Sequence, residues 1–549
     1  MPTPVPQGPP TPLVPQGPPT PPVPPIPIEG GAERAGQRLA TRPVAVPEAI
    51  LERVREQGGT VELEMAARAE AGRDWWPLGI GWAAAGLVPA MPAAVVRPVS
   101  AAQVAELLAS CARDRVPVTA MGGRSGVCGG AIPLYGGVAL DCTGLAGEVE
   151  VDEASLVAEV PAGTSGRDLV ERLRTSGTGY TLGHWPQSVD LSTVGGWIAC
   201  RSAGQWSTRY GKIEDMVVGL QVALADGRIV RTGAQAPRAA TGPDLTQLFT
   251  GSEGVLGVIT RAWLRVHPLP SARDQRAFTF SSFDAGLEAC RRVLRRGATP
   301  AVLRLYDAAE SERTFSHSDG CVLVVADEAD QGLLDATLAV VDEECSSADR
   351  LDASVVDHWL STCNDTSALA PLWRAGIAVD TSEVAGRWAA LPALARDVVG
   401  ALEALDGTIA ASVHLSHAYL DGACLYFTFA GGRPSGEAAS EHAASEHAVS
   451  EHAASGDAGR GAPGASFDAA FAEDYYRRAW DALSVVVAES GAAMSHHHGI
   501  GLSRGRFLAR ALGSAYDVLV SLKQTLDPAG ILNPGKLGIP TTFGEVPWP

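Results

Sequence analysis

A glycine-rich segment between two predicted strands places the strongest limit on the fold of this 549-residue chain. It runs from Gly122-Gly-Arg-Ser-Gly126 to Gly129-Gly130, and the strands are predicted over 116–120 and 137–141. Glycines allow positive φ and close backbone approach, so successive N–H groups can converge on a phosphate. The segment has no Gly-Lys-Ser/Thr, and no Gly-x-Gly-x-x-Gly opens a helix. The chain is therefore neither a P-loop hydrolase nor a typical Rossmann NAD-binding protein.

Further strand patterns follow the glycines along the chain. A hairpin is predicted over 216–231, with Asp226-Gly227 as its turn. Residues 258–267 alternate between apolar and polar as a strand does, and Pro268 and Pro270 are expected to end that strand. Short strands that alternate with helices predict an α+β domain over 95–270.

Two segments have the spacing of amphipathic helices. Ser100 and Gln103 resemble a capping box, and apolar residues follow them at helical spacing as far as Cys111. A second helix is predicted shortly before a run of three histidines. Its apolar face consists of Tyr476, Ala479, Trp480, Leu483 and Val487.

Length and charge limit the organisation and the partners. A chain of 549 residues exceeds one hydrophobic core, so two or three domains are expected, and a hydrophobic content of 46% is ample for them. The net charge of −19 argues against a nucleic-acid partner, which usually needs a basic face. We therefore expect a small-molecule or lipid-like substrate, and leave peripheral membrane contact and a homodimer open.

The cysteines and the chain start favour a cytoplasmic protein. The nine cysteines are scattered and form no Cys-x-x-Cys pair, so neither a disulfide framework nor a zinc ribbon is expected. No apolar run reaches the roughly 18 residues of a membrane span. The first residues show no charged segment followed by an apolar one, so no signal peptide is expected.

Two tracts have a composition that cannot form a core. Residues 1–32 are proline-rich and repeat Val-Pro-Gln-Gly-Pro-Pro-Thr-Pro, and we expect a disordered tail. Residues 433–466 contain three Ser-Glu-His-Ala units and are expected to be a disordered insertion. The histidines of these units, His442, His447 and His452, share no helix face, so they predict no metal site.

The histidine run His496-His497-His498 is the clearest candidate for chemistry. It lies in Ser-His-His-His-Gly-Ile-Gly. Three adjacent imidazoles cannot share one face of a helix or strand, so core packing explains them poorly. A site where protons move, or where a polar ligand is held, explains them better. No carboxylate and no other ligand spacing accompanies them, so we expect no metal.

Three clusters along the chain resemble those of a known flavoprotein superfamily. They are Gly-His184-Trp-Pro-Gln-Ser-Val-Asp-Leu-Ser-Thr-Val-Gly-Gly, Ser202-Ala-Gly, and Gly251-Ser-Glu-Gly-Val-Leu-Gly257. In this order and spacing they resemble the PCMH-type FAD-binding domain of the vanillyl-alcohol-oxidase and methylphenol-hydroxylase superfamily. The resemblance implies FAD and a fold of class α+β, in which two α/β subdomains bind FAD and an α+β cap domain holds the substrate.

Within this superfamily the chain is most similar to the alkyldihydroxyacetonephosphate synthase family. The similarity includes Pro-Ala-Val-Leu-Arg304-Leu-Tyr-Asp, Gly-Ala-Cys-Leu-Tyr426-Phe-Thr-Phe and the C-terminal Leu-Asn-Pro-Gly-Lys-Leu. It implies that Tyr426 is the catalytic acid/base, that the three histidines line the active site opposite His184, and that Arg304 is needed for activity.

The same resemblance implies the residues that bind FAD. They are Met121, Gly122, Gly123, Arg124, Ser125 and Gly126; Gln187, Ser188, Val189, Asp190, Leu191, Ser192 and Thr193; Cys200, Arg201, Ser202 and Ala203; and Glu253, Gly254, Val255, Leu256, Gly257, Val258 and Ile259. Arg124 stands where related oxidases attach flavin through a histidine, which favours non-covalent FAD.

The chain departs from the family at the phosphate end of the substrate. The family has an arginine thought to grip the substrate phosphate, and no arginine falls clearly at its place here. Arg374, some residues out of register, is the candidate substitute, and His417 is a candidate for further polar contact with the substrate.

The resemblance implies a domain order and leaves two kinds of enzyme open. The order is a tail over 1–32, an N-terminal helical segment over 33–90, the FAD-binding domain over 91–270, the cap over 271–495, and a C-terminal segment over 496–549 that returns to the FAD domain.

The first hypothesis is a redox-neutral synthase that exchanges an acyl group for a long-chain alcohol in ether lipid synthesis. The second is an FAD-dependent oxidase or dehydrogenase of a 2-hydroxy acid or alcohol. The metal motif His-x-Gly-Asp-Gly-Asn-x-His, expected in the glycolate and D-lactate branch, is absent. In a third hypothesis, a non-catalytic binding protein, the histidine run would have no chemical role.

Overall fold

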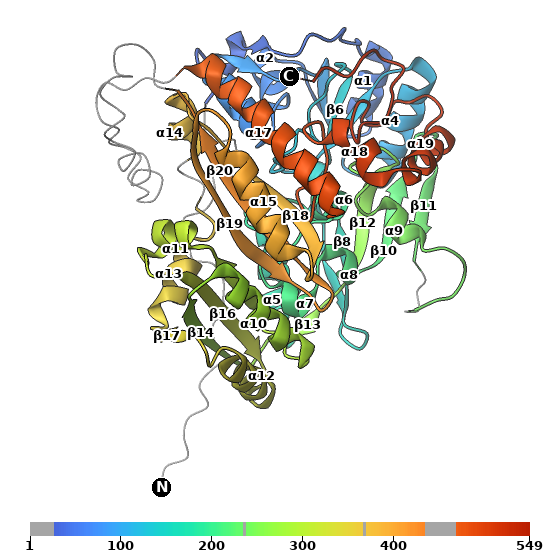
Figure 1. The fold of residues 1–549 in the computed structure, drawn as a ribbon. Coiled ribbons are helices and arrows are strands. Elements are labelled where there is room, and N and C mark those ends of the chain that lie inside the picture. The colour runs from blue at the N-terminus through green and yellow to red at the C-terminus, as the bar shows by residue number, and fades with distance from the viewer. Residues whose placement is uncertain (1–26, 234–237, 366–368, 434–467, 549) are drawn as a thin grey trace.

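Three sheets of four, five and seven strands organise the chain in the computed structural model (Figure 1), which describes residues 27–233, 238–365, 369–433 and 468–548. The four-stranded sheet has the order β2 (Thr60–Glu62), β4 (Ala94–Arg97), β6 (Val138–Asp141) and β5 (Val118–Met121). Strands β4, β6 and β5 are parallel, and α4 (Ala101–Asp114) is the crossover between β4 and β5. The glycine-rich segment follows β5, at the carboxyl end of this sheet.

The N-terminal segment packs against the rest of the chain with mixed structure. Besides α1 (Glu48–Glu56), α2 (Met65–Glu70) and α3 (Pro77–Ala83), it contains η1 (Ala32–Arg34), β1 (Gly36–Gln37) and β3 (Leu87–Val88). The predicted helical segment is thus only partly helical. The predicted tail also ends earlier than expected, because Ile28 is only 4% exposed in the core. Residues 1–26 and the tract 434–467 lie outside the described residues.

The five-stranded sheet is antiparallel and completes the region with the predicted FAD segments. Its order is β11 (Ile229–Thr232), β10 (Val217–Ala223), β12 (Val258–Arg265), β8 (Val157–Pro161) and β7 (Glu150–Asp152). The helices connected to it are α5 (Gly166–Thr175), α6 (Val194–Cys200), α7 (Ser207–Tyr210), α8 (Ile213–Met216) and α9 (Leu245–Phe249). The predicted hairpin is confirmed as β10 and β11. The strand predicted over 258–267 ends earlier, at Arg265 of β12. The short β13 (His267–Pro268) follows, pairs with β9 (Tyr180–Thr181), and stops before Pro270.

The seven-stranded antiparallel sheet forms the second half of the molecule. Its order is β17 (Asp349–Leu351), β14 (Ala272–Phe280), β16 (Cys321–Ala329), β15 (Val302–Tyr306), β19 (Thr408–Ala418), β20 (Gly422–Gly431) and β18 (Ala378–Arg387). Helices α10 (Phe283–Arg295), α12 (Gln331–Glu344), α15 (Leu391–Glu403) and α17 (Ala469–Ser490) pack on one face (Figure 1). The remaining helices of this half are α11 (Ala308–Phe315), α13 (Ser354–Thr362) and α14 (Leu369–Arg374).

Alternation along the strands gives this sheet two different faces. On β15, Leu303 and Leu305 belong to the core under the covering helices, whereas Val302 and Tyr306 belong to the core shared with the five-stranded sheet. Arg304 lies between Val302 and Tyr306 in this alternation, so it shares their face. Polar residues on that face therefore point toward the FAD-binding half of the chain.

The C-terminal segment crosses back between the two halves. The helix α17 is confirmed with its predicted apolar face buried, and it ends at a loop, 491–504, that carries the histidine run. Then α18 (Gly505–Leu512) and α19 (Ala515–Leu526) follow. The chain returns beside β5, where Val118 N donates to Ile531 O at 2.8 Å. None of the described helices combines the length and the apolar composition needed to span a membrane.

Candidate active site

A cavity of about 600 Å³ lies between the glycine-rich loop and the polar face of the seven-stranded sheet. Its FAD-binding side is lined by the loop after β5, by the segment before α6, and by residues at the start of β12. Its other side is lined by Arg304 of β15, His414 and His417 of β19, and Tyr426 of β20. A cavity of this size is within the range of small-molecule and cofactor sites.

The glycine-rich loop is shaped for close backbone contact and leaves several donors free. A Cβ on Gly123 would lie 1.7 Å from Leu191 O, and one on Gly122 would lie 2.2 Å from Thr193 Oγ1, so both positions require glycine. Within the described residues, none of the backbone N–H groups of 123–127 donates a hydrogen bond to another protein atom. Consecutive free N–H groups at the edge of a cavity fit the phosphates of a dinucleotide.

The structure brings most of the predicted FAD residues to this cavity. Those that line it are Met121, Gly122, Gly123, Arg124, Ser125, Gly126, Gln187, Ser188, Leu191, Ser192, Thr193, Cys200, Ser202, Ala203, Glu253, Gly254, Gly257, Val258 and Ile259. Those that do not are Val189, Val255 and Leu256, which are core residues, and Asp190 and Arg201. Asp190 pairs with Arg167 instead, because its side chain faces the N-terminal turn of α5.

The residue at the predicted attachment position, Arg124, is not a nucleophile. The side chain of Arg124 donates to Glu70 O and is thereby fixed on α2. Cys128 and Cys200 line the cavity, but burial raises the pKa of both thiols, so neither is a thiolate at neutral pH.

A row of polar side chains crosses four strands of the seven-stranded sheet. The register pairs Tyr306 with His414, His414 with Tyr426, and Tyr426 with Glu383. His414 and Tyr426 stack with ring centroids 4.9 Å apart. Thr381 Oγ1 donates to Tyr426 Oη at 3.0 Å, and burial raises the pKa of Tyr426, so the phenol stays protonated. Tyr426 thus presents a proton donor to the cavity.

Arg304 is held by neutral partners and keeps a free charge toward the cavity. It donates to Gln205 Oε1 at 2.8 Å, to Ser416 Oγ at 2.7 Å and to His414 Nε2 at 2.9 Å. Since an arginine only donates, His414 Nε2 is the acceptor, and its Nδ1 carries the proton toward Glu310, 3.0 Å away. A buried arginine with these partners is suited to hold an anionic group of a substrate.

The histidine run is fixed by one buried carboxylate that the sequence did not point to. Glu383 Oε1 accepts from the N–H groups of His496, His497 and His498 at 3.1, 3.0 and 2.7 Å. Arg504 donates to both oxygens of the same carboxylate. Burial alone would raise the pKa of Glu383, but Arg504 and the neighbouring His498 hold it well below its usual range. Glu383 is therefore an ionised anchor for the loop.

Glu253 fixes the glycines that follow the histidines. Its carboxylate accepts from Ile500 N at 2.6 Å and from Gly501 N at 2.7 Å. A Cβ on Gly499 would lie 2.7 Å from Glu253 Oε1, and one on Gly501 would lie 2.2 Å from Cys128 O. The Gly-Ile-Gly after the histidines is thus required by close packing on the FAD-binding half.

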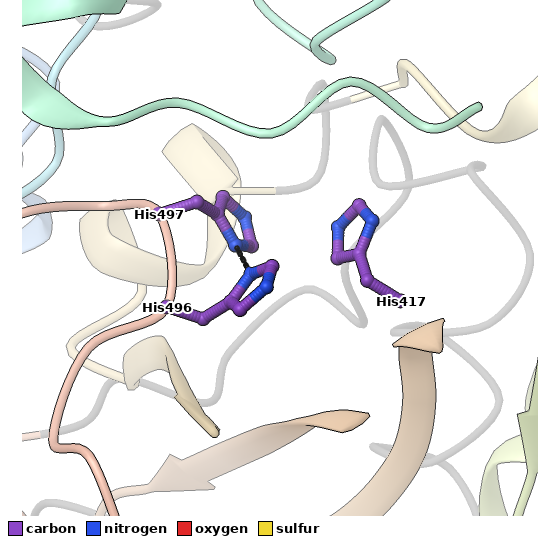
Figure 2. Close-up of side chains that lie close together, drawn as sticks. All are labelled: His417, His496 and His497. Atoms are coloured by element: carbon purple, nitrogen blue, oxygen red, sulfur yellow. Dashed lines mark hydrogen bonds between the residues drawn. The ribbon is translucent and has the colours of Figure 1, made fainter. Parts of the chain in front are cut away.

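A strand irregularity adds His417 to the histidines of the loop. The β19–β20 register shifts between Leu415 and His417, and this bulge lets neighbouring residues Ser416 and His417 both line the cavity. The rings of His417 and His496 stack with centroids 5.1 Å apart, and those of His417 and His497 meet edge to face at 5.1 Å (Figure 2). Burial lowers the pKa of all three rings, which are therefore neutral at neutral pH.

Besides the FAD residues named above, three predicted site residues lie outside the cavity lining. His184 is 1% exposed behind the wall, where Nε2 lies 2.7 Å from Ser202 Oγ, and burial lowers its pKa to about 3. His496 lies just behind His497, and Lys212 donates to its carbonyl oxygen. Arg374 is exposed at the end of α14 and does not reach the cavity, so the structure offers no support for it as a phosphate ligand.

Both halves of the chain match families of flavoproteins. Residues 92–233 match the FAD binding domain family, and residues 269–456 and 463–537 match the C-terminal domain of FAD linked oxidases. The chain therefore belongs to the FAD-linked oxidase family and uses FAD as its cofactor.

The relatives of the chain carry names of different activities. It is 29% identical to the uncharacterized FAD-linked oxidoreductase YgcU of Escherichia coli K12 over 81% of this chain and 89% of that one. It is 26% identical to alkyldihydroxyacetonephosphate synthase of Dictyostelium discoideum (84% and 75%) and 28% identical to glycolate oxidase subunit GlcD of Bacillus subtilis (81% and 89%).

The fold agrees with solved flavoproteins of the PCMH type. A structure of alkyldihydroxyacetonephosphate synthase superposes with a TM-score of 0.69 at 22% identity, over 95% of this chain and 90% of that one. A structure of p-cresol methylhydroxylase superposes with a TM-score of 0.66 at 16% identity, over 91% and 99%. The predicted fold class, a PCMH-type α+β flavoprotein, is confirmed.

Proposed function

We propose that the chain is an FAD-dependent enzyme of the alkyldihydroxyacetonephosphate synthase type. It would replace the acyl group of an acyl-dihydroxyacetone phosphate by a long-chain alcohol and release a fatty acid. The observation that carries this proposal is the proton-transfer set at the cavity. The ring of the protonated Tyr426 stacks on the neutral imidazole of His497 with centroids 6.2 Å apart, and the neutral imidazole of His417 lines the same cavity. A redox-neutral exchange needs both a proton donor and a proton acceptor near the reacting carbon.

The side chains divide naturally between these roles. Tyr426 is placed to donate a proton to the departing carboxylate, and His417 or His497, unprotonated, to accept the proton from carbon. Arg304 is placed to bind the anionic end of the substrate. Bound FAD would supply an electrophilic ring, and the glycine-rich loop would hold its phosphates. His184, behind the wall, would act on the position of Ser202 rather than on substrate.

The second candidate is oxidation of a 2-hydroxy acid or alcohol. It is favoured by the single arginine on the substrate side of the described cavity, since Arg374 is remote and a phosphate is usually bound by more than one donor group. One arginine fits a carboxylate equally well. The names of the relatives YgcU and GlcD agree with this alternative.

Substrate assays under anaerobic conditions separate the two candidates. The synthase reaction gives an alkyl product and a fatty acid, detected by mass spectrometry, without net flavin reduction. Oxidation instead bleaches the flavin stoichiometrically with a hydroxy acid or alcohol. Bleaching by a small hydroxy acid together with no alkyl exchange would refute the first proposal.

A matched pair of tyrosine variants tests the role of Tyr426. Tyr426→Phe should keep FAD and fold but lose roughly a hundredfold or more in turnover, the scale of a general acid. Tyr475→Phe is the control, because Tyr475 is also buried and its hydroxyl also lies near a threonine, Thr408, but it is outside the cavity lining. Equal activity of the two variants would show that the Tyr426 hydroxyl takes no part in the reaction.

A further inference from the structure

Three histidines from two distant segments converge on one point beside the cavity. His417 comes from the end of β19, and His496 and His497 come from the loop after α17 (Figure 2). Each offers one ring nitrogen, and the three nitrogens lie within 4.8 Å of one another. The sequence predicted no metal because neighbouring histidines have no ligand spacing, and the third residue becomes visible only in the fold.

Two of these ring nitrogens lie at a spacing that suits a cation. His496 Nδ1 and His497 Nδ1 are 3.0 Å apart and hydrogen-bonded to each other, so a bound cation would replace the proton that they share (Figure 2). Neighbouring nitrogens on a tetrahedral zinc ion are about 3.3 Å apart, because Zn–N bonds are about 2.0 Å long.

The backbone around the three rings is fixed before any ion binds. Glu383 holds the N–H groups of His496 and His497, and the bulge in β19 sets the position of His417. His417 Nδ1 lies 2.7 Å from Ser207 Oγ, which leaves Nε2 free and orients the ring. A hydrogen bond to the second ring nitrogen is the usual support of a metal-binding histidine.

We propose that His417, His496 and His497 form a three-histidine site for a divalent transition-metal cation such as Zn²⁺. Neutral imidazoles are suitable ligands for this class of cation. His417 and His497 line the cavity while His496 lies behind them, so the fourth coordination position opens toward the substrate. A cation there would polarise a substrate oxygen as a Lewis acid. This site goes beyond the proposed function. An imidazole that binds the cation cannot also accept a proton, so in the metal-bound protein a base other than His417 or His497 would accept the proton from carbon.

Metal binding by the FAD-loaded protein tests the proposal without using activity. The starting protein carries His442→Gln, His447→Gln and His452→Gln, because these histidines outside the described residues could bind cations in solution. After chelation and dialysis, Zn²⁺ is titrated by calorimetry and Co²⁺ by its visible absorption. One equivalent of Zn²⁺, with the intense Co²⁺ bands of tetrahedral coordination, is expected.

Single substitutions assign the ligands. His417→Gln and, independently, His497→Gln should each weaken Zn²⁺ binding by a hundredfold or more, with FAD content as the check of folding. His358→Gln is the control, because His358 is exposed on α13. No stoichiometric binding by the starting protein, or equal binding by the His417 and His358 variants, would overturn the site. A protein that binds no metal but still catalyses the proposed reaction would contradict this site and leave the proposed function unaffected.

Discussion

The buried carboxylate of Glu383 should be the most sensitive single position of the histidine loop. Glu383 is 0% exposed and Arg504 is 1% exposed, and they form one ion pair. In Glu383→Gln the amide oxygen can still accept from the loop N–H groups that now bind Oε1. The amide nitrogen, however, replaces Oε2 and cannot accept from Arg504. The substitution therefore leaves a buried guanidinium without its counter-charge.

The size of this effect follows from the burial of both partners. Breaking a buried pair by removal of one partner costs about 3–5 kcal/mol, because the remaining charge stays desolvated. We therefore expect the free energy of unfolding of Glu383→Gln to fall by about this amount. Glu383→Gln combined with Arg504→Met should recover part of the loss, because no buried charge is then left unpaired.

Urea unfolding followed by tryptophan fluorescence measures these differences. The control is Glu343→Gln, which breaks an exposed pair with Arg296 and should cost no more than about 0.5 kcal/mol. A loss below about 1 kcal/mol in Glu383→Gln, or a double variant less stable than the single one, would refute the view that Glu383 anchors the loop as an ion.

Three further predictions concern the cofactor, the insertion and one buried acid. Acid precipitation should release the flavin from the protein, whereas colour in the pellet would reveal a covalent link. Replacement of 434–466, outside the described residues, by a short Gly-Ser linker should change flavin content and turnover little, since closure entropy depends weakly on length; a large loss of either would contradict this. Burial raises the pKa of Asp307 to about 6, so the folded protein keeps this proton up to a higher pH than the unfolded chain. Its contribution to stability should fall by up to about 3 kcal/mol as pH rises from about 4 to 6. Asp307→Asn should remove this slope in unfolding experiments, and an unchanged slope would refute the assignment.

Local signals in the sequence predicted the elements of the FAD-binding half well. Ser100 Oγ accepts from Gln103 N as the N-cap of α4, although Gln103 Oε1 accepts from Val99 N rather than completing the box. Asp226-Gly227 turns between β10 and β11 as expected. Such features depend on a few neighbouring residues, so they can be read without knowledge of the fold.

Residues joined only by the fold were not predictable in the same way. Glu383 has an ordinary strand sequence around it, and its role arises because β18 ends beside a loop more than a hundred residues further along the chain. The metal-site geometry depends on a bulge at Ser416, which shifts His417 by one register position. No periodicity marks either feature, since both depend on pairing between distant segments.

The two carboxylates that hold the histidine loop come from different halves of the molecule. Glu383 belongs to the seven-stranded sheet and accepts from the three histidine N–H groups, while Glu253 belongs to the FAD-binding half and accepts from the N–H groups of Ile500 and Gly501. The loop can satisfy both acceptors only when the two halves are docked. The imidazoles therefore reach their places beside Tyr426 in the same step that closes the cavity. Assembly of the proton-transfer set is thereby coupled to formation of the FAD site, so neither half alone would hold it.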